Sequence, residues 1–293
     1  MERPTARLLP DGKRLLLQQG PIDLVVQAMG EPPAVQVAYQ AAVARFDGLL
    51  EELCEELALL RKPVSAKSPQ PQGPIARRMH AAVVPFAADI FITPMAAVAG
   101  AVAQEILGAM VAAAPLQRAF ANNGGDIALH LAAGEQFRIG LVDLPEQPNL
   151  FATATIAAAD GIQGVATSGY PGRSFSLGIA EAVTVLAETA AMADAAATVI
   201  ANAVDLPGHP AITRRPANEL QTDSDLGALP VTRHVGRLSD AEIGRALEAG
   251  LATAADLQRR SLIRSCAIQL QGRAKTLAPA ALTDNMMREL SHG

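Results

Sequence analysis

The pentapeptide Asn122-Asn123-Gly124-Gly125-Asp126 stands directly before an apolar run, Ile127-Ala128-Leu129-His130-Leu131, that is typical of a β-strand. Two adjacent glycines permit positive φ angles, so their N–H groups can point into one concavity and approach a ligand closely. Asp126 could hold such a turn by accepting hydrogen bonds from nearby backbone N–H groups. The same residues also suit a plain turn joining a helix to a strand, and the local chemistry leaves both interpretations open.

A second glycine-containing segment, Thr167-Ser168-Gly169-Tyr170-Pro171-Gly172-Arg173-Ser174, comes at the end of a predicted strand over 164–167. Its backbone N–H groups, its hydroxyls and the Arg173 guanidinium could donate hydrogen bonds to a phosphate or a carboxylate. The segment lacks the Gly-Lys-Ser/Thr step of a P-loop, and a solvent-facing hairpin is the alternative interpretation.

The helix predicted over 190–203 consists almost entirely of strong helix formers and carries Asp194 and Thr198. Their i, i+4 spacing puts both oxygen-bearing side chains on one face. A carboxylate among alanines is costly to bury without partners, and a carboxylate with a hydroxyl suits a hard cation such as Mg²⁺. The alternative is that Asp194 faces solvent or pairs with an arginine. The uniformly small neighbours favour the metal.

The rest of the sequence predicts an α+β protein in which helices pack on a mainly antiparallel sheet. The segment 63–74, PVSAKSPQPQGP, predicts a surface loop rather than a linker, so that 1–293 forms a single domain. The runs 127–131 and 137–142 are expected to pair, and the last dozen residues to fray. The predicted strands are 15–17, 22–26, 127–131, 137–142, 151–156, 164–167, 184–186 and 263–270, and the predicted helices are 34–61, 96–112, 190–203 and 240–249.

Three local patterns support these predictions. Gly20-Pro21 predicts a turn between the strands 15–17 and 22–26. An apolar stripe at helical spacing runs along 34–61 and consists of Val37, Ala41, Ala44, Leu49, Leu53, Leu57 and Leu60. Ser239, with Glu242 three residues on, predicts a capping box at the start of the helix 240–249.

Composition argues against several classes of function. The net charge is −5 and basic residues are scattered, which argues against a nucleic-acid partner. The five histidines do not cluster, so a zinc site is not expected. The apolar stretch Met95–Ala103 stops at Gln104-Glu105, short of the roughly 20 residues of a membrane helix, and the N-terminus has no signal-peptide pattern. We therefore expect a cytoplasmic protein with no membrane partner, and the sequence leaves open a homo-oligomer.

Taken together, the three segments resemble the ApbE family (FAD:protein FMN transferases), and more closely its UPF0280 branch. The resemblance implies an ApbE-like α+β fold, a small-molecule or nucleotide ligand such as FAD or FMN, and Mg²⁺. On this resemblance we assign Asp126 and Arg173 as catalytic residues. Asn123, Gly124, Gly125, Thr167, Ser168 and Gly169 are assigned to cofactor binding, and Asp194, Thr198 and the backbone carbonyl of Ala97 to the metal. Further matching segments are 19–24, 92–100, 172–180 and 193–198.

Two departures from the ApbE pattern bear on activity. The segment Ala97-Val98-Ala99-Gly100 resembles the start of a helix in the ApbE family, but the family has a lysine where this chain has Gly100. The family's His-Ile-x-Asp-Pro-x-Thr-Gly segment is missing, because Ser174–Ala182 is far shorter and holds no His-x-x-Asp-Pro. The sequence is consistent with two functions: a Mg²⁺-dependent transferase or hydrolase, and a non-catalytic small-molecule or flavin-binding protein with the same fold.

Overall fold

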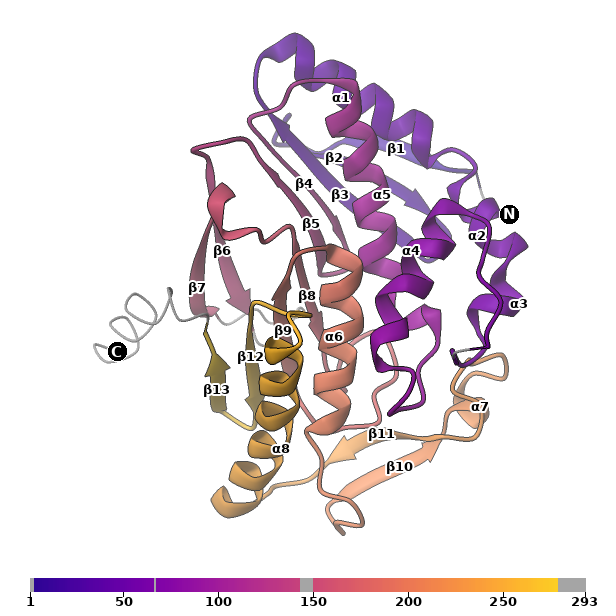
Figure 1. Ribbon diagram of the computed structural model, residues 1–293, viewed down its shortest axis with the longest axis vertical. Coiled ribbons are helices and arrows are strands. Elements are labelled where there is room, and N and C mark those ends of the chain that lie inside the picture. Colours follow the sequence, from indigo (N-terminus) through magenta and orange to yellow (C-terminus); the bar gives the residue numbers. More distant parts are fainter. Residues whose placement is uncertain (1–2, 66, 143–149, 279–293) are drawn as a thin grey trace. The chain divides into compact units, whose positions relative to one another are not determined.

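The computed structural model (Figure 1) describes residues 3–65, 67–142 and 150–278. Two compact units make up the chain. Unit 1 draws on the segments Met1–Phe137, Ala157–Ala166 and Glu188–Ala195, and unit 2 on Arg138–Ile156, Thr167–Ala187 and Ala196–Gly293. The units interleave along the chain, and the predicted loop 63–74 lies wholly inside unit 1. The single domain over 1–293 stays a prediction, and the expected fraying of the last dozen residues lies outside the described residues.

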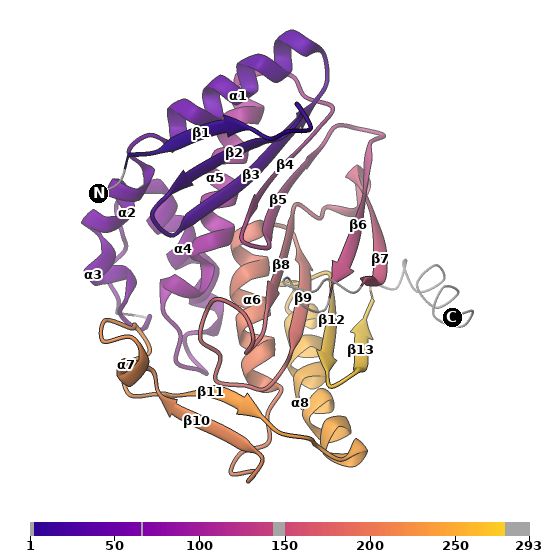
Figure 2. The same ribbon diagram turned by 180° about the vertical axis from the view of Figure 1, so that it is seen from behind.

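Unit 1 is built on an antiparallel sheet in the order β1-β2-β3-β4-β5-β8, to which β8 contributes its first residues (Figure 2). In β3 the residues alternate strictly between buried and half-buried, so one face of this strand lies in the core. The predicted strands at 15–17 and 22–26 are therefore confirmed. The strand bounds are β1 Thr5–Leu8, β2 Leu15–Gln19, β3 Ile22–Met29, β4 Arg118–Asn123, β5 Asp126–Leu131 and β8 Gly164–Ser168.

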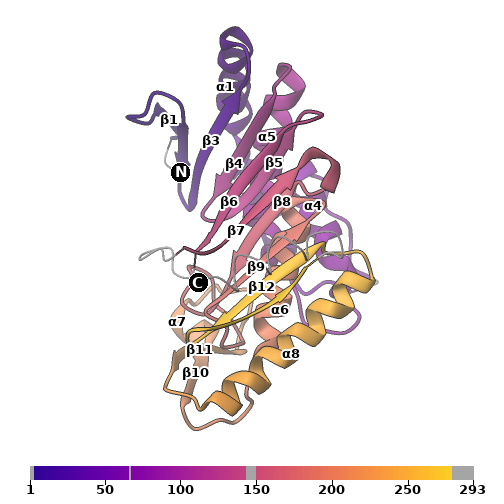
Figure 3. The same ribbon diagram turned by 90° about the vertical axis from the view of Figure 1, so that its left-hand side faces the viewer.

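Helices α1 (Pro32–Phe46) and α5 (Val98–Ala113) lie on the same side of β3 and β4 (Figure 3). The residues of β4 that face α5 are small: Ala119 and Ala121 are completely buried, and they share a face with Asn123, which bonds α5. The Glu105 carboxylate of α5 ties two further helices to this layer. It accepts from Arg45 of α1 at 2.7 Å and from Arg78 of α4 (Pro74–Val83) at 2.8 Å.

The single helix predicted over 34–61 is wrong, because the segment forms three helices: α1, α2 (Leu49–Glu55) and α3 (Leu57–Leu60). Gly48 precedes α2 with φ +77°, a left-handed conformation that ends the helical path and that glycine adopts without strain. The predicted apolar stripe holds in α2, where Leu49 and Leu53 are buried, but not in α1. There Val37 is 43% exposed and Ala38, Ala42 and Phe46 form the buried face.

The described residues of the predicted loop 63–74 lie outside helices and strands up to Gly73, and the segment is anchored at both ends. The Val64 N–H donates to the Ile92 carbonyl at 3.0 Å, and the Glu56 carboxylate accepts from the N–H groups of Gln72 and Gly73. Pro74 then begins α4, which the sequence did not predict. Pro is favoured at the first helical position because its missing N–H would have no partner there.

The helical stretch Pro94–Ala113 combines the short 3₁₀ helix η2 (Pro94–Ala97) with α5. It is 20 residues long and contains an 18-residue window with a mean hydropathy of 1.6, so by length and composition alone it could cross a membrane, contrary to the shortfall expected from the sequence. It is the one such helix among the described residues. The core helix of a folded unit passes the same test, so this is weak evidence for a membrane span.

Unit 2 contains the antiparallel strands β9 (Ala182–Ala187), β12 (Ser265–Leu270) and β13 (Arg273–Leu277), against which helix α8 (Asp240–Arg259) packs. It also holds the ribbon of β10 (Ile212–Pro216) and β11 (Pro230–Val235), with the short helix α7 (Ala217–Leu220). The expected pairing of 127–131 with 137–142 is wrong. Strand β6 (Gln136–Val142) pairs with β7 (Leu150–Ala157), while β5 lies between β4 and β8.

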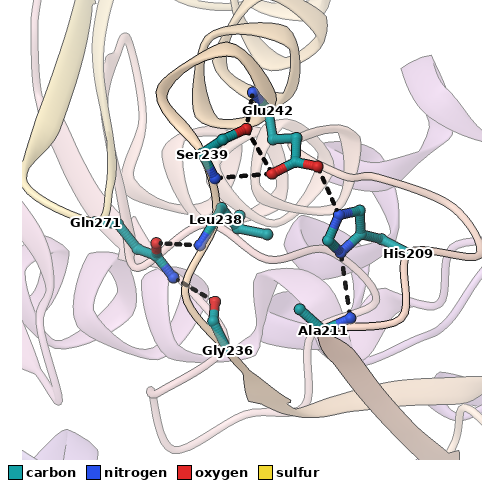
Figure 4. A network of polar contacts seen from close by, with 7 residues as sticks. All are labelled: His209, Ala211, Gly236, Leu238, Ser239, Glu242 and Gln271. Atoms are coloured by element: carbon teal, nitrogen blue, oxygen red, sulfur yellow. Dashed lines mark hydrogen bonds and ion pairs between the residues drawn. The ribbon is translucent and has the colours of Figure 1, made fainter.

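The predicted capping box at the start of α8 is confirmed. Ser239 and Glu242 bond each other reciprocally, with the Ser239 N–H donating to the Glu242 carboxylate at 2.7 Å. His209 Nε2 meets the second oxygen of Glu242 at 2.9 Å, while its Nδ1 accepts from the Ala211 N–H (Figure 4). The hydrogen bonds from the Ser239 hydroxyl, the Ser239 N–H and His209 lower the pKa of Glu242 to about 2. The helix itself continues ten residues past its predicted end at Ala249, to Arg259.

Candidate functional site

The Asn122–Asp126 segment is a tight hairpin between β4 and β5 rather than a turn from a helix to a strand. Asn123 and Asp126 face each other across the two strands, and the glycines between them have φ angles of +66° and +116°. A two-residue turn of this kind requires positive φ at both positions, which explains the glycine pair. The Gly125 N–H donates to the Asn122 side chain at 2.9 Å, so the turn already uses one of the two glycine donors.

Asn123 and Asp126 lie on the side of the sheet that faces α5. The Asn123 side chain is buried, with 8% of its surface exposed, and its amide donates to the Ala99 carbonyl in the first turn of α5 at 3.3 Å. Residues paired across a hairpin share a face, so Asp126 lies on this side as well. The hairpin thus brings a carboxylate towards the start of α5.

Asp194 reaches the same helix end from α6 (Ala190–Ala203), whose bounds match the prediction. Its carboxylate accepts from the Gly100 N–H at 2.9 Å, across 94 positions of sequence, and also from the Ala99 N–H. The first N–H groups of a helix lack partners within the helix, and the N-cap residue Ala97 has no side-chain oxygen to offer. Asp194 supplies that cap from a distant helix, at the end where the helix dipole favours negative charge.

Asp194 sits in an electrostatically unfavourable place for an ionised carboxylate. Burial raises its pKa well above the ordinary value, and the nearby charge of Asp126 raises it further, although the N–H groups of Gly100 and Ala99 partly oppose the shift. Within the described part of the chain, no basic side chain forms an ion pair with Asp194. Two carboxylates therefore approach each other at a helix N-terminus, where a bound cation would relieve their repulsion.

Gly100 lies where the backbones of α5 and α6 meet. A Cβ atom added to Gly100 would stand 2.3 Å from the carbonyl oxygen of Ala190 and 2.6 Å from its carbon, much closer than side chains approach backbone. This position therefore accepts no side chain without a backbone shift. The contact gives a physical reason why the lysine of the ApbE pattern is replaced by glycine here.

The other two assigned metal ligands, the Ala97 carbonyl and Thr198, stay predictions. Ala97 is completely buried and is the N-cap of α5, whose carbonyl ordinarily accepts the first intrahelical bond. Thr198 follows Asp194 by one turn of α6 and is half-buried, in the part of that helix that belongs to unit 2. In the described ranges no three His, Cys, Asp or Glu side chains cluster as a metal site would require. A metal held here would thus rely on two carboxylates and on oxygens of other kinds.

Unit 2 holds the second predicted segment as a loop, 169–181, between β8 and β9. The Thr167 and Thr184 hydroxyls lie 2.9 Å apart beside it. The Tyr170 N–H donates to the Ala180 carbonyl at 2.9 Å and closes the base of the loop. Gly169 permits this closure, because a Cβ there would stand 2.2 Å from the Glu181 carbonyl oxygen.

The far half of this loop is anchored, whereas its tip is open to solvent. The Asn202 side chain of α6 accepts from the Leu177 N–H at 2.9 Å and from the Ser176 hydroxyl at 3.2 Å. Arg173, near the tip, is exposed, and none of the residues that the structure describes forms a hydrogen bond or ion pair with it. Ser168 is half-buried. The loop therefore presents the exposed Arg173 guanidinium to solvent, while hydrogen bonds hold the rest of the loop in place.

The chain matches one protein family over most of its length. The model of a family described as "AbpE bacteria" matches residues 6–276. A UPF0280 protein of Methanosphaerula palustris is 34% identical over 183 residues, which cover 58% of this chain and 69% of the relative. The chain therefore belongs to the AbpE bacteria family and to the UPF0280 proteins within the ApbE-like group. It spans less of other relatives: 65% of a UPF0280 protein of Methanopyrus kandleri, at 34% identity over 58% of this chain.

Solved structures of flavin transferases align with the chain at low sequence identity. The apo form of the Pseudomonas stutzeri flavinyl transferase ApbE aligns with a TM-score of 0.48 and 13% identity, over 98% of each chain. The flavin transferase ApbE of Vibrio cholerae aligns with a TM-score of 0.40 and 11% identity, over 96% of this chain and 99% of that one. The described residues form an α+β arrangement whose assigned strand registers are all antiparallel, as the sequence predicted.

Proposed function

We propose that this protein is a Mg²⁺-dependent transferase or hydrolase that acts on the phosphate part of a nucleotide ligand, with FAD and FMN as the first candidates. The observation that carries the proposal is the pair of carboxylates, Asp126 and Asp194, at the N-terminus of α5. Membership of the ApbE-like group supports a flavin nucleotide as the ligand.

The donor set of unit 1 fits a hard divalent cation. Mg²⁺ prefers oxygen ligands, and it is commonly held by one or two carboxylates with water and substrate phosphate completing its shell. Asp194 and Asp126 would hold the ion, with the Ala97 carbonyl as a further oxygen ligand. Bound there, Mg²⁺ would polarise a phosphoryl oxygen and offset its negative charge.

The remaining assigned residues suit the same ligand class through their own chemistry. The exposed Arg173 guanidinium can form paired hydrogen bonds with a phosphate group. The hydroxyls of Thr167 and Ser168 and the backbone at Gly169 offer further donors. In the hairpin, Gly124 and Gly125 let backbone approach a ligand closely. Asp126 is proposed as a catalytic residue because its carboxylate could orient a bound water or hydroxyl.

The binding proposal is tested by thermal unfolding of EDTA-treated protein with Mg²⁺, FAD and FMN, alone and in pairs. A ligand that binds only the folded state raises the melting temperature. At a concentration one hundred times its dissociation constant, it stabilises the folded state by about 2.7 kcal/mol. We expect Mg²⁺ with a flavin nucleotide to stabilise the wild type and not Asp194→Asn. Asp23→Asn, on the opposite face of β3, should behave like the wild type. No shift with any combination would contradict the proposal.

A specific observation favours the second candidate, a non-catalytic flavin-binding protein. The short 169–181 loop holds no histidine, so the histidine segment of the flavin transferases has no counterpart here. We expect little or no FMN transfer to a threonine-containing peptide in the presence of FAD and Mg²⁺. Fluorescent peptide that survives denaturation and forms at about 1 per second or faster would show this expectation to be wrong. Binding of FAD without release of FMN would favour the non-catalytic function over the enzyme.

A further inference from the structure

The peptide group between Ala99 and Gly100 is bonded on both of its polar sides. Its carbonyl oxygen accepts from the Asn123 amide at 3.3 Å, and its N–H donates to the Asp194 carboxylate at 2.9 Å. A peptide group is planar, so its carbonyl and N–H cannot turn independently. A bond that fixes one end of the group also fixes the direction in which the other end points.

The surroundings leave this peptide little freedom. Gly100 stands in backbone contact with Ala190 at the start of α6, where no Cβ would fit, and Asn123 is buried. Asn123 lies at the end of β4, opposite Asp126, so the strand that presents one carboxylate also fixes the peptide that holds the other. One N–H of its amide is used by the Ala99 carbonyl, so this side chain binds the protein's own backbone.

We infer that Asn123 is a positioning residue, which acts through the Ala99–Gly100 peptide to hold the Asp194 carboxylate where a divalent cation would bind. The inference rests on the proposed function, and it revises the assignment of Asn123 as a cofactor-binding residue. Partners that orient metal ligands from behind are commonly worth 10–100-fold in metal affinity. The carbonyl of Ala99 and the N–H of Gly100 transmit the effect, and Asn123 itself makes no contact with the metal.

The test compares Mg²⁺ affinity, measured by calorimetric titration of the EDTA-treated full-length protein, among wild type, Asn123→Ala and Asn123→Leu. Leucine keeps the branched shape of the side chain, with larger methyl ends, and removes its donor. We expect both variants to weaken Mg²⁺ binding by about 10-fold or more while melting cooperatively in EDTA. The control, Gln27→Ala, truncates a half-buried amide on the opposite face of the same sheet and should leave the affinity unchanged. Unchanged affinity in a folded Asn123 variant would overturn the inference.

A second readout separates this inference from the proposed function. Hydrogen exchange of the Gly100 amide, followed by NMR without any metal, reports the bond to Asp194 directly. We expect Asn123→Leu to speed this exchange about 10-fold, with amides in the last turn of α5 unaffected. If wild type binds no Mg²⁺, the proposed function fails and this exchange measurement alone decides the inference. Equal exchange of Gly100 in wild type and variant would refute it.

Discussion

Replacing Gly100 by alanine should destabilise the protein, whereas the same replacement at Gly108 of the same helix should stabilise it. A Cβ at Gly100 would lie 2.3 Å from the Ala190 carbonyl oxygen, about 1 Å short of the 3.4 Å at which ordinary contact begins. Nothing lies within 4 Å of a Cβ added at Gly108. The two glycines share α5, so intrinsic helix propensity favours alanine at both.

The magnitude depends on two opposing contributions to the free energy of unfolding. Alanine in place of glycine inside a helix gains about 0.5–1 kcal/mol. Overpacking that forces a backbone shift costs about 1–3 kcal/mol, and the obstructing atoms at Gly100 are backbone atoms of α6 that cannot rotate away. We therefore expect Gly100→Ala to lower the free energy of unfolding by about 1–2 kcal/mol, and Gly108→Ala to raise it by about 0.5–1 kcal/mol.

The assay is equilibrium unfolding in urea, followed by far-ultraviolet circular dichroism, with the slope compared among the variants. A shifted midpoint at constant slope reports a change in stability alone. If Gly100→Ala is as stable as Gly108→Ala, the close backbone contact that places Gly100 against α6 does not exist. The Asp194 cap on α5 would then lose its structural basis.

The pH dependence of folding and the integrity of the chain provide further tests. Because its folded pKa is raised, Asp194 favours the folded state when protonated, so without metal its contribution is lost as pH rises through that pKa. Asp194→Asn, measured by urea unfolding at pH 7 in EDTA, should therefore be more stable than wild type, and lower stability would contradict the burial argument. Glu242 has a folded pKa of about 2 against an ordinary 4.5, so the stability that it contributes is present above pH 4.5 and is lost as the pH falls towards 2. Glu242→Gln should flatten this part of the curve of unfolding free energy against pH. An unchanged curve would argue against the capping box. The fragment 75–293 should be insoluble on expression, because it lacks β2 and β3 of the unit 1 sheet; a soluble, cooperatively folding fragment would show the expected single domain to be wrong.

The sequence predicted elements best where local chemistry was strong. Helix α6 was predicted at its observed bounds because alanine, the best helix former, makes up most of it. The β2–β3 hairpin followed from two apolar runs around Gly20-Pro21. Strand β4 was missed because its core positions are alanines and an asparagine, residues with low β-propensity that are buried only because α5 packs on them. The formation of this strand therefore depends on tertiary packing, which cannot be read from a single sequence.

The assignment of residues to the candidate site stays a prediction, whereas the hydrogen bonds of those residues are observed and were not predicted. The alanine-rich surroundings of Asp194 correctly indicated a carboxylate in need of compensation. The compensation that the structure shows comes from backbone N–H groups 94 positions away, which no local pattern signals. The role of Asn123 was missed for the same reason, since its partner is the carbonyl of Ala99. The double glycine at 124–125 signalled the turn, and the turn placed Asp126.

The central claim, that Asp126 and Asp194 together hold a divalent cation, is tested most directly by calorimetric titration of Mg²⁺ into metal-free wild type and into Asp126→Asn and Asp194→Asn. We predict one Mg²⁺ site in the wild type, with affinity reduced by more than about 10-fold in each variant, because each loses a charged oxygen ligand. Equal Mg²⁺ affinity in the wild type and both variants would contradict the claim.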